Sequence, residues 1–241
     1  MISKTRGIIL KTLKYGESSL ILDIYTEDFG LRSYIVSGVR NKKKGNKAGL
    51  LQTMALVSLV AYHKSSNSLN RIKEIKADKL YQSLPFEISK SSVGLFITEV
   101  TRRSITQDEQ SDSLFNLLYE SYLYLDRAQQ SITLFPIIFL IKLSKELGFS
   151  PADNYSEQRE VFNIQQGQFV SINNPSDYTL DPETSQYLFS LLFEEYGISN
   201  QFKISKDIRQ QIINQLVNFY RIHIDNFGQI KSLDVLKEVF S

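Results

Sequence analysis

The sequence predicts an α+β protein in which a small β-barrel precedes a helical domain. Three observations carry this prediction. Short apolar runs separated by turn residues fill residues 1–80, apolar residues then recur at helical spacing, and the net charge changes sign between the two parts. With 241 residues, of which 42% are hydrophobic and 12% aromatic, the chain is long enough for two cores. We expect one domain at residues 1–80 and a second at residues 81–241.

The first domain is predicted to contain short strands joined by turns. In the clearest strand, Leu20, Leu22 and Ile24 alternate onto one face, and Glu27–Gly30 supplies a tight turn into the next strand. The expected strands are Gly7–Leu13, Leu20–Tyr25, Leu31–Val36, Met54–Tyr62 and Leu69–Ile75, the last of them a polar edge strand. Short strands at this density favour a small closed barrel. Among such barrels, the five-stranded OB-fold usually carries oligonucleotides on its open face and loops.

From Leu84 onward the apolar pattern has a helical period. The stripes expected to be buried are Val93, Phe96, Ile97 and Val100; Phe115, Leu118, Tyr122 and Leu125; Tyr187, Leu188, Leu191 and Leu192; and Ile208, Ile212, Leu216, Phe219 and His223. Leu134–Leu147 is apolar nearly all round and is expected to be a buried helix. Asp181 and Ser205 are helix starts, and a short last helix is expected at Ser232–Phe240. Val161–Ile172 predicts a β-hairpin inserted between the helices.

The charge is distributed unevenly along the chain. Residues 1–80 contain 15 Lys and Arg against 6 Asp and Glu, whereas the remaining 161 residues contain 13 against 20. The net charges are therefore +9 and −7. A cationic module joined to an anionic one is typical of a protein with one polyanion-binding part.

A basic loop at Gly38–Gly49 is the sharpest feature of the first domain. Its cations concentrate positive potential where a phosphate backbone could lie, and neighbouring strands add further positive charge, although such loops are also often simply solvated. The candidate DNA-binding residues are Arg32, Arg40, Lys42, Lys43, Lys44, Lys47, Lys64 and Arg71. Tyr34 and Tyr62 could stack on bases, but packing into the core is the more common role of strand aromatics.

The chain contains no Cys and two His, which excludes thiolate nucleophiles, disulfides and cysteine zinc sites. No nucleotide-binding or catalytic motif is present, so we expect no enzyme, no cofactor and no metal. Asp23, Glu27 and Asp28 leave open a magnesium-dependent nuclease as an alternative. His223 lies on an apolar stripe and is expected to be packed and hydrogen-bonded, and His63 is expected to be half exposed.

Two further expectations concern partners and location. Arg127, Lys142 and Lys145 are isolated cations in the acidic domain, and a cation beside an apolar groove could capture an acidic, aromatic peptide tail. Neither a signal sequence nor a long apolar segment is apparent, so we expect a cytoplasmic protein that does not enter the membrane.

Several segments together resemble the RecO family of bacterial recombination mediators. These are Gly7–Leu10, Glu17–Leu22, Gly30–Arg40, Ala48–Gln52, Leu59–His63, Arg71–Ile75, Glu99 with its helix, Leu147–Pro151 and Tyr220–Leu236. No single one of these segments is diagnostic. Their order along essentially the whole chain carries the resemblance.

The resemblance implies an N-terminal OB-fold, a C-terminal helical domain and binding of single- and double-stranded DNA. It also implies strand annealing without ATP, help in loading RecA, and RecR and the acidic tail of the single-strand-binding protein as partners. Many family members hold zinc through four cysteines around an insert like Val161–Ile172. Because this chain has no Cys, we expect a metal-free insert near residues 150–175.

The resulting hypothesis is a non-enzymatic, DNA-binding recombination mediator that is associated with the nucleoid. A generic RNA- or single-strand-binding OB-fold protein without mediator activity is the main alternative, and it would prefer ribose-containing strands. A protein scaffold that binds no nucleic acid is disfavoured by the +9 charge of the first domain.

Overall fold

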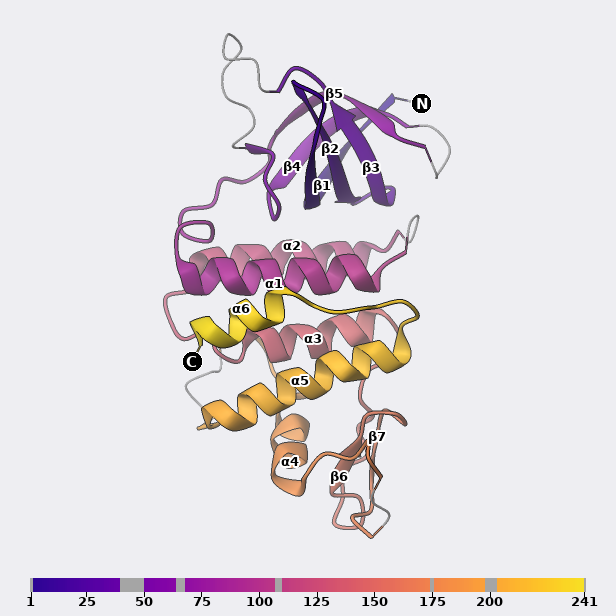
Figure 1. Cartoon of the computed structure of the whole chain (residues 1–241), viewed down its shortest axis with the longest axis vertical. Helices are drawn as coiled ribbons and strands as arrows, with labels where there is room; N and C mark the ends of the chain where they lie inside the picture. Colours follow the sequence, from indigo (N-terminus) through magenta and orange to yellow (C-terminus); the bar gives the residue numbers. More distant parts are fainter. Residues whose placement is uncertain are drawn as a thin grey trace. The chain divides into compact units, whose positions relative to one another are not determined.

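The computed structural model describes residues 2–39, 50–63, 68–106, 110–173, 176–197 and 203–240 (Figure 1). The chain divides into two compact units. The first comprises residues 1–84 together with residues 105–123, and the second comprises residues 85–104 together with residues 124–241. The domain boundary near residue 80 stays a prediction, because the first unit also includes a helical segment from further along the chain.

The described part of the first unit contains a closed five-stranded barrel, as predicted. Its strands are β1 (Ile2–Tyr15), β2 (Ser19–Thr26), β3 (Gly30–Val36), β4 (Leu56–Tyr62) and β5 (Asn70–Ala77), in the order β1-β2-β3-β5-β4. The long strand β1 closes the barrel because its two halves have different neighbours. Residues 2–8 pair with β4, and residues 7–15 pair with β2. This architecture is that of the OB-fold.

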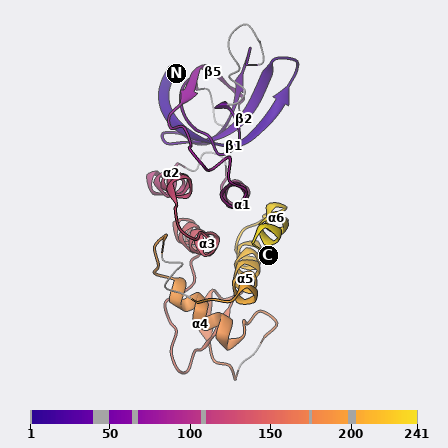
Figure 2. The same cartoon turned by 90° about the vertical axis from the view of Figure 1, so that its left-hand side faces the viewer.

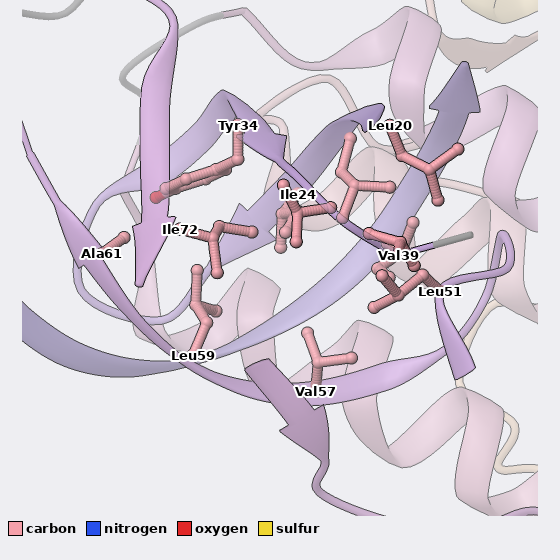
Figure 3. Close-up of a cluster of buried hydrophobic side chains, with 12 residues drawn as sticks. Leu20, Ile24, Tyr34, Val39, Leu51, Val57, Leu59, Ala61 and Ile72 are labelled. Carbon is pink, nitrogen blue, oxygen red and sulfur yellow. The ribbon is translucent and has the colours of Figure 1, made fainter. Parts of the chain in front are cut away.

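The barrel core is built by side chains that alternate inward along the strands. Leu20, Leu22 and Ile24 are at most 5% exposed, which confirms the predicted alternation. Leu22 belongs to the same buried cluster, and Figure 3 shows Leu20 and Ile24 in this cluster with Val57 and Leu59 of β4. At Gly7, where β1 pairs with both neighbours, an added Cβ would lie 2.5 Å from Cγ2 of Ile24. The barrel therefore has no room for a side chain at this position.

The prediction that the fifth strand is an edge strand was wrong. β5 pairs antiparallel with β4 and also pairs parallel with β3, through Tyr34 with Asn70 and Ile35 with Arg71. These two parallel pairs close the barrel. The sequence of β5 resembles that of an edge strand because its outer face is polar. The pairing of β5 with β3, which is distant along the chain, leaves no local signal in the sequence.

Residues 105–123 are attached to the barrel by a cation from β1. They include most of α2 (Asp112–Arg127). The Arg6 guanidinium lies 5.3 Å from the ring centre of Phe115 and 5.0 Å from that of Tyr119. Arg6 also donates two hydrogen bonds to the Glu27 carboxylate, from Nε at 2.9 Å and from Nη2 at 2.5 Å. These hydrogen bonds hold the pKa of Glu27 below its usual value. The Tyr119 hydroxyl donates to Asp78 at 2.6 Å.

The second unit is largely helical (Figure 2). Its described elements are α1 (Ile88–Ser104), α3 (Phe135–Glu146), α4 (Pro182–Leu191), α5 (Lys206–His223) and α6 (Ser232–Val239), with the short strands β6 (Val161–Asn163) and β7 (Gln168–Val170). Helix α1 packs against α3 and α6, and α3 packs against α5. The predicted helix starts are confirmed, because Asp181 accepts from the Thr184 amide and Ser205 from the Ile208 amide.

The predicted hairpin forms from β6 and β7, and polar side chains brace its backbone. Asn154 makes two hydrogen bonds to the backbone of Phe169, donating at 3.0 Å and accepting at 2.9 Å. Asn163 Oδ1 accepts from the amides of Gln165 and Gln166, both at 2.9 Å. Aromatic packing of Phe162 on Phe169 completes the insert. These contacts satisfy backbone polar groups of the insert.

Candidate nucleic-acid interface

A groove on the surface of the barrel carries three exposed lysines. Lys4 comes from β1, and Lys73 and Lys76 come from β5. Val60 and Ile75 contribute apolar surface between them. The other lining residues are Val36, Ser37, Gly38, Val39, Leu51, Ser58, Ile72 and Glu74. With three lysines against one glutamate, the lining is cationic, and within the described residues none of these lysines is ion-paired.

The exposure of Lys73 results from an irregularity in β5. Val60 of β4 faces Glu74, but the next residue, Ala61, faces Ile72, so Lys73 is an extra residue in the ladder. This is a β-bulge, which re-aims the side chains around it. Both Lys73 and Glu74 are consequently exposed, whereas strict alternation would turn one of them inward.

Sequence reasoning missed Lys4, Lys73 and Lys76 as members of one site. Lys4 is distant in sequence from the other two, and the bulge depends on the pairing with β4. The only sequence signal was the polar outer face of the fifth strand. A polar outer face is typical of an edge strand, so the pattern does not by itself indicate a binding surface.

Among the sequence-predicted DNA-binding residues, Arg71 is exposed on β5, two positions before Lys73. Arg32 is half-buried, and its Nε donates to the carbonyl of Phe29 at 3.2 Å. The remaining candidates, Arg40, Lys42, Lys43, Lys44, Lys47 and Lys64, lie outside the described residues. Tyr34 is fully buried in the core, whereas Tyr62 is 41% exposed at the end of β4.

His63 is buried, so the prediction that it is half exposed was wrong. Only 9% of its surface is accessible. Its Nδ1 lies 2.8 Å from the Ser3 hydroxyl, its Nε2 lies 3.0 Å from the Tyr34 hydroxyl, and its ring stacks on Phe29 with centres 3.9 Å apart. Burial, and then the nearby positive charge of Arg32, hold the pKa of His63 below its usual value.

The depressed pKa of His63 predicts that the barrel loses stability as the pH falls below about 6.5. Between the folded-state pKa of His63 and about 6.5, the unfolded chain carries a proton on this residue that the folded chain lacks. The free energy of unfolding therefore decreases as the pH falls through this range. Urea unfolding at several pH values above about 5 measures this, because the carboxylates with lowered pKa, such as Glu27, titrate below that range. His63→Gln should remove the slope, and an equal slope in that variant would contradict the prediction.

Two of the three carboxylates considered for a magnesium site are engaged separately. Glu27 pairs with Arg6, and Asp23 accepts from Ser33 Oγ at 2.8 Å. Throughout the described ranges, no three His, Asp or Glu side chains come together as a metal site would need.

The cations predicted to bind a peptide have different environments. Lys142 Nζ makes an ion pair with Glu195 at 2.7 Å and lies 5.6 Å from the ring centre of Tyr196. Arg127 and Lys145 are exposed near the C-terminal ends of α2 and α3. His223 is hydrogen-bonded and packed as expected: its Nε2 lies 3.2 Å from the Ile164 carbonyl, and its ring centre lies 4.4 Å from that of Phe219 and 5.6 Å from that of Phe149. The residue nevertheless remains exposed on one side.

A second groove in the helical unit combines an apolar floor with a cationic rim. The floor includes Ile213 of α5 and Leu233 and Leu236 of α6, and the rim carries Lys206 and Arg209. The remaining lining residues are Thr133, Pro136, Gln210, Lys237 and Phe240. The sequence shows these cations only as separate charges, because α5, α6 and residues 133 and 136 come together around the groove only in the folded chain.

Glu99 of α1 holds the start of α6 in place. Its carboxylate accepts from the Ser232 amide at 2.8 Å, the Ser232 hydroxyl at 2.6 Å and the Lys231 amide at 3.2 Å. Although burial alone would raise the pKa of Glu99, these hydrogen bonds lower it below its usual value. The carboxylate therefore caps the first turn of the helix that forms one wall of the groove.

None of the helices in the described part of the chain combines the length and apolar character that a bilayer-spanning helix requires.

Comparison with known proteins gives similarities over both units. The family described as recombination protein O, N terminal, matches residues 1–81, and the family described as recombination protein O, C terminal, matches residues 85–234. The DNA repair protein RecO of Phocaeicola vulgatus is 34% identical over 243 residues, and that of Bacteroides fragilis is 34% identical over 242 residues. That of Christiangramia forsetii is 32% identical over 241 residues. Each alignment covers 100% of both chains.

Proposed function

The chain belongs to the RecO family of DNA repair proteins, and from this premise we propose that it is a recombination mediator. It binds single- and double-stranded DNA, anneals complementary strands without ATP and helps load RecA onto DNA covered by the single-strand-binding protein. RecR is a further partner, and the protein acts at the nucleoid without catalysing a reaction. The observation that carries this proposal is the groove on the OB-fold barrel, with three exposed lysines that make no ion pair with any described residue.

The barrel acts through its charge. Lys4, Lys73 and Lys76 neutralise phosphates and release counterions, so that two strands can lie close together without mutual repulsion. Base pairing between the strands then supplies the sequence specificity. Arg71 and the sequence-predicted cations of the basic loop are proposed to add further phosphate contacts.

The helical unit recruits the single-strand-binding protein through the groove between α5 and α6. An acidic tail with an apolar end suits this groove, because its apolar side chains find a floor and its carboxylates find Lys206, Arg209 and Lys237. We favour this groove over the surface around Lys142, since that lysine is already paired with Glu195.

The mediator function is tested with complementary oligonucleotides coated with the single-strand-binding protein. The chain should accelerate their annealing in the absence of ATP, with activity that declines as salt increases. Equal affinity for RNA and DNA without annealing would favour the alternative of a generic nucleic-acid-binding protein. Cleavage of labelled DNA on addition of magnesium would contradict a non-enzymatic role.

For the tail groove, we predict that Lys206→Glu combined with Lys237→Glu weakens binding of the acidic tail peptide about tenfold, which corresponds to about 1.4 kcal/mol. The two substitutions place like charges beside the peptide carboxylates. Fluorescence polarisation of the labelled peptide measures the dissociation constant. The matched control is Arg127→Glu with Lys145→Glu, which makes the same charge change in the same unit. A larger effect of the control pair would assign the tail to the sequence-predicted cations instead.

A further inference from the structure

An exposed row of side chains crosses three neighbouring strands on the outer surface of the barrel. Ile2 of β1 pairs with Tyr62 of β4, and Tyr62 pairs with Arg71 of β5. Residues directly opposite each other in a sheet share one face, so the three side chains lie side by side. Ile2 is 52% exposed, Tyr62 is 41% exposed, and Arg71 is exposed as well. The row therefore presents an aromatic ring between an aliphatic side chain and a cation.

The polar groups of this row have no partners within the described residues. Neither the Tyr62 hydroxyl nor the Arg71 guanidinium makes a hydrogen bond or an ion pair there. The same unit contains another pair of an arginine and a tyrosine ring whose polar groups have partners within the protein. Arg6 lies over the ring of Tyr119 and is ion-paired with Glu27. In contrast to that contact, the side chains of Tyr62 and Arg71 are exposed and have no polar partner among the described residues.

The neighbouring row is cationic and belongs to the lysine groove. Lys4 pairs with Val60 two positions along the strands from Ile2 and Tyr62, and the bulged Lys73 follows Arg71 on β5. Two residues along a strand correspond to about 7 Å. Among the described residues, the strand positions around the ring thus carry three cations, Lys4, Arg71 and Lys73, against one carboxylate, that of Glu74. This charge favours a polyanion with exposed rings over an apolar protein surface.

We propose that Ile2, Tyr62 and Arg71 form a stacking platform for an unpaired base of single-stranded nucleic acid, while the adjacent lysines hold its phosphates. The inference rests on the proposed DNA binding and adds a means of telling single strands from duplex. A base inside a duplex is already stacked between its neighbours and cannot lie on Tyr62. The lysines contact phosphates, which both forms present.

The test compares single-stranded and duplex DNA of equal length at one salt concentration. Tyr62→Ser should weaken single-strand binding about tenfold and duplex binding less than twofold. Tyr62→Phe should bind single strands as tightly as the unmodified chain, because the ring is retained. The salt dependence should stay unchanged in Tyr62→Ser, since stacking releases no counterions. Tyr15→Ser is the matched control, because Tyr15 is 55% exposed on the same barrel but does not belong to this row.

Three outcomes would overturn the platform. These are an equal loss on both forms of DNA, no loss on single strands, or failure of Tyr62→Phe to restore binding. A variant that binds DNA normally but no longer binds a partner protein would assign the row to a protein interface. If the unmodified chain itself shows no salt-dependent DNA binding, the proposed function fails, and this result is distinguishable from failure of the platform alone. Circular dichroism of each variant establishes that the barrel is folded.

Discussion

Replacing Lys4, Lys73 and Lys76 together by glutamine is expected to lower the affinity for single-stranded DNA about fifty-fold at about 0.15 M salt. Each phosphate contact on a single strand contributes roughly 0.7 to the slope of log affinity against log salt. Loss of three contacts should therefore flatten the slope by about 2. With the affinities of the variant and the unmodified chain taken as equal near about 1 M salt, this change in slope gives a loss of about fifty-fold at about 0.15 M. Fluorescence polarisation across a salt series measures both quantities.

The matched control replaces Lys11, Lys14 and Lys79, which belong to the same unit but do not line the groove. Both triple variants lose the same net charge. If the control weakens binding and flattens the slope as much as the groove variant does, the effect belongs to the overall field of the barrel, and the groove assignment is wrong. Duplex DNA should also lose affinity in the groove variant, because its phosphates are contacted in the same way.

Gly7→Val is expected to destabilise the first unit by about 3 kcal/mol. The new Cβ would lie 2.5 Å from Ile24 Cγ2 and 3.2 Å from Leu59 Cδ2, and both of those side chains are buried in the closed barrel. Because β1 is paired on both sides at this residue, the backbone cannot move away without loss of ladder hydrogen bonds. A loss of this size lowers the melting temperature of a unit of about 100 residues by more than about 10 °C.

The control for this prediction is Gly16→Ala in the turn after β1. Gly16 has a φ of 60°, and an added Cβ would meet nothing within 4 Å. The cost there is about 1 kcal/mol and comes from backbone conformation alone. Calorimetry or urea unfolding compares the two variants. Equal decreases in the free energy of unfolding for Gly7→Val and Gly16→Ala would mean that the barrel can adapt at Gly7 and that the steric argument is wrong.

The strands and helices of this protein were largely predictable from local patterns. Leu20, Leu22 and Ile24 alternate in the sequence, and they point into the barrel core. Asp181 and Ser205 are helix-capping residues by type, and each accepts a hydrogen bond from an amide in the first turn of its helix. Such signals involve residues a few positions apart, so they persist in almost any fold that the chain could adopt.

The candidate site was predictable only in part. Its place on the first, cationic part of the chain follows from strand patterning and charge. Arg71, predicted from the sequence to bind DNA, is exposed on β5, and its binding role stays a prediction. The grouping of Lys4 with Lys73 and Lys76 was not predictable, because it depends on how β1, β4 and β5 pair. Likewise, Lys142 was expected to be available to a peptide, but Glu195, which lies 53 positions away in the sequence, pairs with it.

By itself, then, the sequence determined the family, the fold class, the strand and helix segments and the cationic character of the first part of the chain. Within the described residues, the tertiary structure alone decided which cations are ion-paired, which residues form a groove and which aromatic rings are exposed. The physical reason is the range of the interactions. Periodicity, capping and net charge act locally or additively along the chain, whereas strand register, bulges and ion pairs join residues that only the folded backbone brings together.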